Sequence, residues 1–66
     1  MMKNINKIVV DGTVVVEREM RVWDKNDFIL RFGPGQEVQF HVDQIYEDEA
    51  HCTLVSGAEV LKARAA

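Results

Sequence analysis

Apolar and polar residues alternate through most of this chain, and from position 14 to position 54 the apolar ones fall mainly on even numbers. Side chains of a β-strand point to opposite faces in turn, so a period of two places the apolar set on one face of a sheet. To keep the same numbering parity from one strand to the next, each turn must contain an odd number of residues. We therefore expect consecutive strands that share one buried, even-numbered face.

The strongest turn signal is Asp11-Gly12, which separates two valine-rich runs. This dipeptide favours a two-residue type I′ hairpin, in which both central residues take positive φ angles. Such a turn predicts the following strand register: Val10 with Thr13, Val9 with Val14, Ile8 with Val15, and Lys7 with Val16.

Three later turns are predicted to have odd lengths, over residues 25–27, 33–37 and 47–49. They join neighbouring strands through even-numbered pairs. Arg18 is a charged exception on this face. The predicted pairs are Val22 with Leu30, Met20 with Phe32, Phe32 with Val38, Leu30 with Phe40, Phe28 with Val42, Val42 with Leu54, Gln44 with Cys52, and Tyr46 with Ala50.

The C-terminal segment changes from strand-forming to helix-forming residues. Ser56 followed by Glu59 matches a capping box, and the residues after it are good helix formers. A helix over residues 57–65 is too short to be stable alone, so we expect it to dock through Val60 and Leu61.

This pattern predicts a single, mainly β domain over residues 1–66. The expected fold is a five-stranded antiparallel meander, either an SH3-like small barrel or a strongly curved sheet, with a short C-terminal helix. A mixed sheet packed on one short helix is the competing arrangement. The expected strands cover residues 5–10, 13–23, 28–32, 38–46 and 50–55, and the expected helix covers residues 57–65.

The length of the chain and its cysteine content indicate how it is stabilised and in which cellular compartment we expect it. A chain this short buries only about 60% of the surface that its unfolded form exposes, and small domains are commonly reinforced by disulfides, metals or oligomerisation. Cys52 is the only cysteine, which excludes an intrachain disulfide and suits a reducing cytosol. We find no segment that predicts a membrane span or a secretion signal, so we expect a cytoplasmic protein without a membrane partner.

Charge disfavours nucleic acid as a partner. The net charge is −3. Residues 36–66 carry six acidic but only two basic side chains, whereas residues 1–35 carry five acidic and six basic ones. An acidic protein repels the phosphate backbone, whose attraction to basic residues drives most nucleic-acid binding.

Few residues suggest catalysis or metal binding. His41 and Asp43 share the outer face, but the adjacent residues His51 and Cys52 point to opposite faces and cannot both bind one ion. Cys52 lies on the inner face, so we expect a buried, inert thiol. No nucleophile is paired with a base. We therefore expect no catalytic residue, no cofactor and no metal, and hence no enzyme.

One outer-face cluster is a candidate site for an anion or an acidic partner. The predicted register places Arg21 opposite Arg31, and like charges across a ladder are unfavourable unless something neutralises them. Glu19 is one neutralising group, and a bound ligand is the other, with Trp23 stacking on it. The candidate site comprises Arg21, Trp23, Ile29, Arg31, Gln39 and His41.

Apolar residues also occur on the face opposite the predicted core: Ile8, Val10, Val15, Trp23, Ile29, Ile45 and Val55. The short helix covers only some of them, and burying the rest contributes about 25 cal/mol per Å² of apolar surface. We therefore expect a non-enzymatic protein-interaction module that self-associates, with a dimer favoured. Its candidate interface comprises Ile8, Val10 and Val15, while Val9, Val14 and Val16 join the core.

Two segments resemble RNA-binding families. "VVDGTVVV" followed by "WDKNDFILRF" is similar to the first half of an Sm-like barrel, although Glu17 and Arg18 stand where such barrels have a strand-bending glycine. "EVQFHVDQIY" resembles the late strand of the carbon-storage regulator family, with Val42 at the position of its RNA-contacting arginine. These resemblances imply a small-barrel RNA-binding protein as an alternative function. A barrel that binds a small ligand is a third.

Overall fold

A computed structural model describes residues 2–65, which form five β-strands and one α-helix. Met1 and Ala66, the two ends of the expected domain, lie outside the described residues. A mainly β fold with a short C-terminal helix is thus confirmed. The elements are β1 Met2–Val10, β2 Thr13–Trp23, β3 Asp27–Gly33, β4 Gln36–Tyr46, β5 Glu49–Ser56 and α1 Ala58–Ala65.

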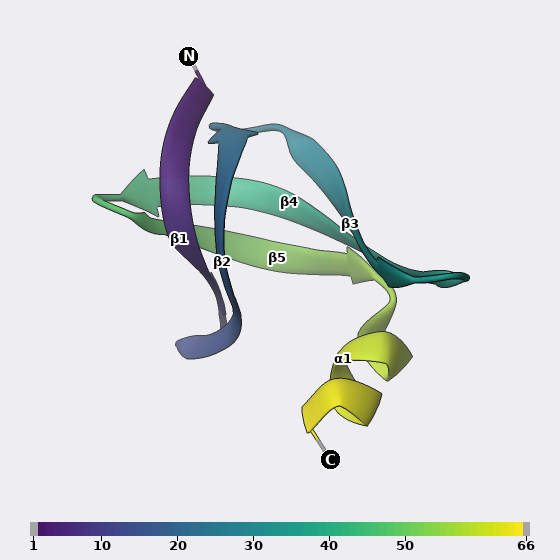
Figure 1. The fold of residues 1–66 in the computed structure, drawn as a ribbon. Helices are drawn as coiled ribbons and strands as arrows, with labels where there is room; N and C mark the ends of the chain where they lie inside the picture. The colour runs from purple at the N-terminus through teal and green to yellow at the C-terminus, as the bar shows by residue number, and fades with distance from the viewer. Residues whose placement is uncertain (1, 66) are drawn as a thin grey trace.

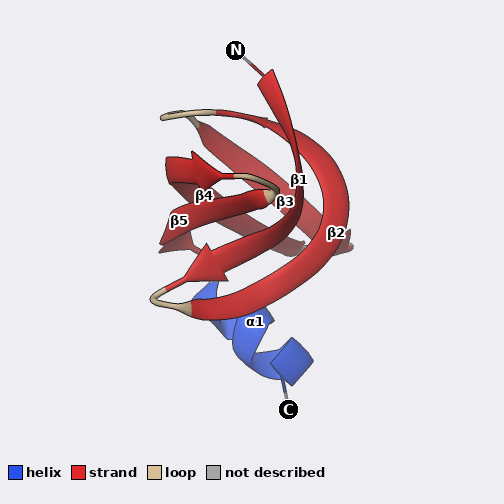
Figure 2. Cartoon of the chain, turned by 90° about the vertical axis from the view of Figure 1, so that its left-hand side faces the viewer, coloured by secondary structure: helices blue, strands red, loops and turns tan. Residues whose placement is uncertain are grey.

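The strands form one mixed sheet in the order β2-β1-β5-β4-β3, curled into a half-barrel (Figures 1 and 2). Neighbours pair antiparallel, except that β1 and β5 run parallel. The four links between strands each reverse the chain, so β5 regains the direction of β1 and can only pair with it in parallel. Of the expected shapes, the strongly curved sheet is the one observed, and the sheet is mixed instead of purely antiparallel.

The predicted pairing of β2 with β3 is wrong. In the part of the chain that the structure describes, these strands lie at opposite edges of the sheet. β2 instead pairs along its length with β1, which begins at Met2, earlier than expected. Two register shifts in this ladder mark β-bulges, which bend a strand and increase its twist. Figure 2 shows β2 bent into a long arc. The actual partners of the residues predicted to face β3 are Ile5 for Met20, Lys3 for Val22 and Met2 for Trp23.

The first hairpin contains the predicted type I′ turn, with φ angles of 50° at Asp11 and 77° at Gly12. A bulge at Val15 then changes the register, so the next predicted pairs are wrong. The two predicted pairs nearest the turn are confirmed, Val10 with Thr13 and Val9 with Val14, while Ile8 pairs with Val16 and Lys7 with Glu17.

The other two hairpins are tighter than predicted, because Pro34-Gly35 and Glu47-Asp48 form two-residue turns. A register shift in each ladder compensates, so even-numbered residues still face each other in much of the sheet. The corrected pairs are Phe28 with Phe40, Leu30 with Val38, Phe40 with Leu54, Val42 with Cys52, Gln44 with His51, Ile45 with Ala50, and Tyr46 with Glu49.

The core confirms most of the predicted even-numbered face. Besides Arg18, three members of that face are exposed instead: the polar Gln44, and Val14 at 44% and Tyr46 at 52%, which both lie beside hairpin turns. Arg18 is accommodated because its guanidinium lies over the ring of Phe32, 5.5 Å from the ring centroid. The connected buried core consists of Ile5, Ile8, Val16, Val22, Leu30, Val38, Phe40, Val42, Ala50 and Cys52.

Gly57 sets the position of α1. Its φ is 91°, and a Cβ atom built on it would lie 2.4 Å from the carbonyl oxygen of Glu37. The helix begins one residue later, with Val60 and Leu61 packed against the core as expected. The predicted capping box is wrong, because Ser56 ends β5 and pairs with Gln39. No helix within residues 2–65 has the length and apolarity needed to cross a membrane.

We expect Gly57→Ala to destabilise the fold more than Gly12→Ala. Both glycines have positive φ, which costs a residue with a side chain about 1–2 kcal/mol, but only at Gly57 would the new methyl group meet backbone atoms. Urea unfolding followed by circular dichroism measures the two losses. Equal losses would show that the close approach of Gly57 to β4 does not constrain the chain.

Candidate interaction surface

Four of the six residues predicted as a partner site come together on the outer face of β3 and β4. Ile29 pairs with Gln39, and Arg31 and His41 lie on either side of this pair. They share a face because all four are odd-numbered residues of one antiparallel ladder. Ile29 is 60% exposed, more than the other exposed large hydrophobic side chains within residues 2–65.

The other two predicted residues lie elsewhere. Arg21 pairs with Asn4 and Trp23 with Met2, both on the ladder between β1 and β2. The predicted opposition of Arg21 and Arg31 is therefore wrong, since β1 occupies the place expected for β3. Trp23 is 48% exposed on β2, the edge of the sheet opposite to β3.

Arg31 is neutralised by Glu37, a residue of the predicted turn over residues 33–37 that lies instead in β4. Glu37 lies directly opposite Arg31, and its Oε2 accepts hydrogen bonds from Nη2 at 2.5 Å and Nε at 3.0 Å. The Arg31 side chain remains 71% exposed, so this ion pair contributes little to stability.

Asp27 organises a second polar cluster at the start of β3. Its Oδ2 accepts a hydrogen bond from Gln39 Nε2 at 3.0 Å, and its Oδ1 lies 2.5 Å from His41 Nδ1. The hydrogen bond with His41 holds the pKa of Asp27 below its ordinary value, and the bond from Gln39 acts in the same direction. Burial acts to raise the pKa of Asp27, but by less than these hydrogen bonds lower it.

The cluster extends along β4 to β5. The second ring nitrogen of His41, Nε2, lies 3.9 Å from Oδ1 of Asp43, whose Oδ2 accepts a hydrogen bond from Thr53 Oγ1 at 2.6 Å. Lys25 Nζ donates to the backbone oxygen of Asp43. His41 thus lies between the carboxylates of Asp27 and Asp43.

The remaining candidates for chemistry lie apart from this cluster. His51 Nε2 is 3.3 Å from Glu49 Oε1, and its ring meets Tyr46 edge-on. Cys52 is buried, as expected, and burial raises its pKa to about 11. Within residues 2–65, no three His, Cys, Asp or Glu side chains are grouped so as to hold a metal ion.

The predicted oligomer interface is only partly at the surface. Ile8 has no exposed area and belongs to the core, so its assignment to a free face is wrong. The bulge at Val15 is the reason, because it places Ile8 opposite the buried Val16. Val10 and Val15 are half-buried and pack against the core.

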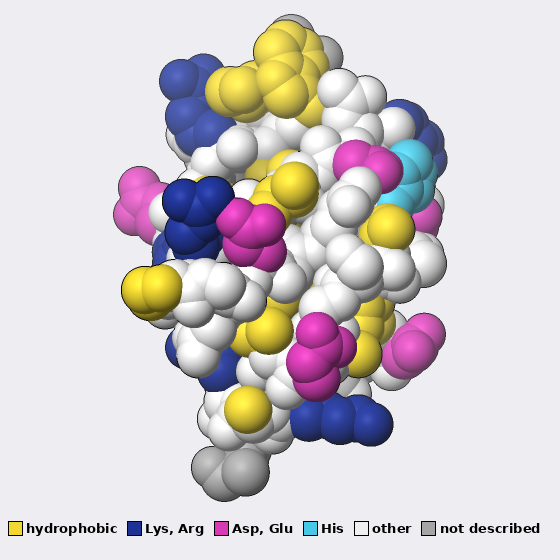
Figure 3. Space-filling model, turned by 90° about the vertical axis from the view of Figure 1, so that its right-hand side faces the viewer, with side chains coloured by type: hydrophobic (Ala, Val, Ile, Leu, Met, Phe, Trp, Pro, Cys, Tyr) yellow, Lys and Arg dark blue, Asp and Glu magenta, His cyan; other side chains and the backbone are white. Residues whose placement is uncertain are grey.

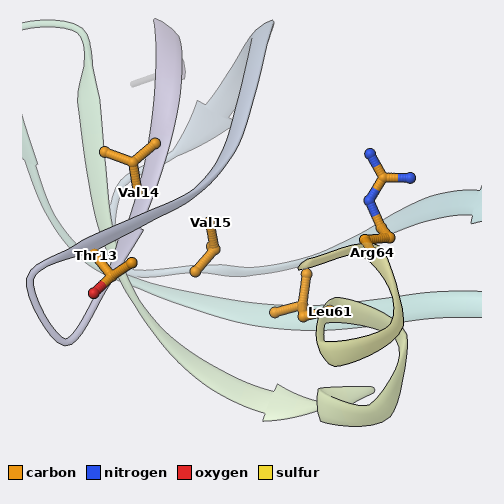
Figure 4. A pocket seen from close by; sticks show the side chains of 5 residues that line it. All are labelled: Thr13, Val14, Val15, Leu61 and Arg64. Atoms are coloured by element: carbon orange, nitrogen blue, oxygen red, sulfur yellow. The ribbon is translucent and has the colours of Figure 1, made fainter. Parts of the chain in front are cut away.

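A pocket of about 330 Å³ lies between the start of β2 and α1. Figure 4 shows Val14 and Val15 on one side of it and Leu61 and Arg64 on the other. The Arg64 guanidinium is already engaged with Phe32, at 4.2 Å from the ring centroid. None of the predicted partner-site residues lines this pocket.

The surface mixes charge and apolar side chains. Figure 3 shows basic and acidic side chains interspersed with separate hydrophobic patches on one face of the molecule. Comparison of the chain with protein-family models, with curated proteins and with solved structures found no match in any of the three. Functional inference therefore depends on the geometry of the chain itself.

We expect Asp27→Asn to remove a pH-dependent part of the stability. Because His41 lowers the pKa of Asp27, folding favours the ionised carboxylate. This contribution is present above the carboxyl pKa of the unfolded chain, about 3.9, and is lost as pH falls through the lower pKa of the folded state. The variant should be less stable than wild type at pH 7, and the two should converge in acid.

Urea unfolding at a series of pH values measures this difference. Asp24→Asn, in the turn after β2, controls for the loss of one carboxylate. A destabilisation by Asp27→Asn that is the same at every pH would show that the contact with His41 does not favour the charged form.

Proposed function

We propose that this protein is a non-enzymatic protein-interaction module that self-associates, with a dimer as the favoured assembly. The observation that carries the proposal is the open sheet, whose two edge strands each present a large exposed hydrophobic side chain, Trp23 on β2 and Ile29 on β3. Unpaired strand edges with apolar residues are sites where a second chain adds to a sheet.

The size of the chain supports association. Small domains have little core from which to draw stability, and total stabilities are only about 5–15 kcal/mol. Each 100 Å² of apolar surface that a second copy covers contributes roughly 2.5 kcal/mol before the cost of association. Within residues 2–65, five large hydrophobic side chains are at least 44% exposed: Val14, Trp23, Ile29, Tyr46 and Val55.

The polar groups support a binding role over a catalytic one. His41 is held between Asp27 and Asp43, whose carboxylates lie 2.5 and 3.9 Å from its two ring nitrogens. Cys52 is buried with a raised pKa, and its Sγ donates to the backbone oxygen of Ala50, which keeps it an unreactive thiol. A buried free thiol also fits the reducing cytosol, which we propose as the compartment.

Size-exclusion chromatography with light scattering over a dilution series tests the proposal. We expect a mass near twice the 7.5 kDa of the chain at micromolar concentration, falling towards the monomer mass on dilution. A mass of one chain at every concentration would contradict self-association. Saturable, salt-sensitive binding of random RNA by a monomeric protein would favour the RNA-binding alternative instead.

A further inference from the structure

The edge of β3 that faces away from β4 is unpaired in the part of the chain that the structure describes. At the start of this ladder, the amide of Val42 donates to the carbonyl of Asn26 at 2.9 Å. Backbone groups of an antiparallel strand point to its two sides in turn. Even-numbered residues of β3 therefore bond to β4, whereas Asp27, Ile29 and Arg31 direct their N–H and C=O groups to the open edge.

The side-chain contacts agree with this assignment. Across an antiparallel ladder, side chains lie closest at the pairs that do not exchange backbone hydrogen bonds. The odd-numbered pairs Asp27 with His41 and Arg31 with Glu37 each have polar atoms 2.5 Å apart. A regular row of free backbone groups thus runs along the edge from Asp27 to Arg31.

The other edge is less suited to pairing. The ladder of β2 contains two register shifts, and its middle carries the run Glu17, Arg18 and Glu19. Bulges and charged residues are the devices that keep an edge strand from adding another strand. The β3 register is regular from Asp27 to Arg31 and shifts only beyond Arg31.

We infer that two copies of this chain pair antiparallel along β3, with Ile29 on the two-fold axis, so that two half-barrels share one continuous sheet. This inference rests on the proposed self-association and names the surface that performs it. A two-fold interface brings the same patch of both copies together, so the patch must be complementary to itself.

The charges of β3 select this register. The free backbone N–H and C=O groups of β3 occur at odd-numbered residues. Odd-numbered residues of one copy must therefore lie opposite odd-numbered residues of the other. With Ile29 opposite the partner's Asp27, Arg31 would lie beyond the start of the partner's β3, at the turn that contains Lys25, a second cation. With Ile29 opposite the partner's Arg31, Asp27 would face Gly33. With Ile29 opposite itself, Asp27 faces Arg31 twice, and opposite charges across a ladder are favourable.

The same register continues the existing ion pairs across the interface. Glu37 bonds to Arg31 within one copy, and Asp27 bonds to His41 within the other. Pairing along β3 joins them into a row of alternating sign: Glu37, Arg31, the partner's Asp27 and the partner's His41. Each dimer contains this row twice, with the exposed Ile29 side chains packed between the two rows.

The inner face is complementary as well. In this register Phe28 lies opposite the partner's Leu30, so apolar residues face each other there. Phe28 is half-buried and stacks on Phe40 within its own sheet, with ring centroids 5.4 Å apart. The apolar row of Phe40 and Phe28 thereby continues into the second copy through Leu30 and Val38 of the partner subunit.

Ile29→Lys tests the location of the interface. It places two ammonium groups on the two-fold axis, and we expect the dimer dissociation constant to rise at least about ten-fold. Val55→Lys is the matched control, because Val55 is 51% exposed but lies on β5, an interior strand of the sheet. Circular dichroism of each variant verifies folding, and sedimentation velocity measures association.

A charge exchange tests the register. Asp27→Arg alone creates two facing arginine pairs, and Arg31→Glu alone creates two facing acidic pairs, so each variant should be monomeric. An equimolar mixture restores opposite charges at both positions, and native mass spectrometry should detect the mixed dimer.

The outcomes of these experiments distinguish pairing along β3 from self-association in general. A wild-type dimer that persists in Ile29→Lys, or a mixture of the charge variants that stays monomeric, overturns pairing along β3 while leaving self-association intact. A wild-type chain that is monomeric throughout overturns the proposed function together with this inference.

Discussion

The parallel pairing of β1 with β5 holds this fold together. It joins the β1–β2 hairpin to the β3–β4–β5 meander through the pairs Lys7 with Glu49, Ile8 with Ala50, and Val9 with His51. The carbonyl of Asp48 extends the contact by accepting hydrogen bonds from the amides of Asn6 and Lys7. Ile8 and Ala50 are fully buried at this junction, so the pairing also connects the two halves of the core.

The free edges of the sheet follow from the same pairing. Because β1 pairs with β5, the curled sheet remains open between β2 and β3, and both of these edge strands carry exposed apolar side chains. The two edges differ in regularity, because bulges that bend β2 around β1 also interrupt its outer row of backbone groups. The segment of β3 with a regular register is the one left available for the proposed pairing, in which the charges of a second copy would complement its own.

Local patterns predicted the strands and the buried face, but they could not predict how the strands join. Alternation and the Asp11-Gly12 turn are properties of short segments, whereas the β1–β5 contact joins residues about forty positions apart. The bulge at Val15 has no distinct signal in a run of valines. It is the reason that Ile8, expected at the surface, lies in the core.

The candidate site was predicted only in part, again because local patterns do not fix how the strands join. Ile29, Arg31, Gln39 and His41 were grouped correctly because a register error of two residues leaves the face unchanged. Asp27 and Glu37, the acidic partners of His41 and Arg31, were missed because the predicted loops contained them. Both residues lie in strands, Asp27 at the start of β3 and Glu37 near the start of β4. Arg31 is therefore neutralised by Glu37 of its own sheet, and not by Glu19 or a bound ligand.

Nuclear Overhauser contacts between backbone protons test the strand arrangement most directly. The account predicts cross-strand contacts of a parallel ladder linking Ile8 to Ala50 and Val9 to His51, with Val22 in contact with Lys3. Antiparallel contacts between Val22 and Leu30 would contradict it, because they would place β3 beside β2 and remove the free edge on which the proposed association depends.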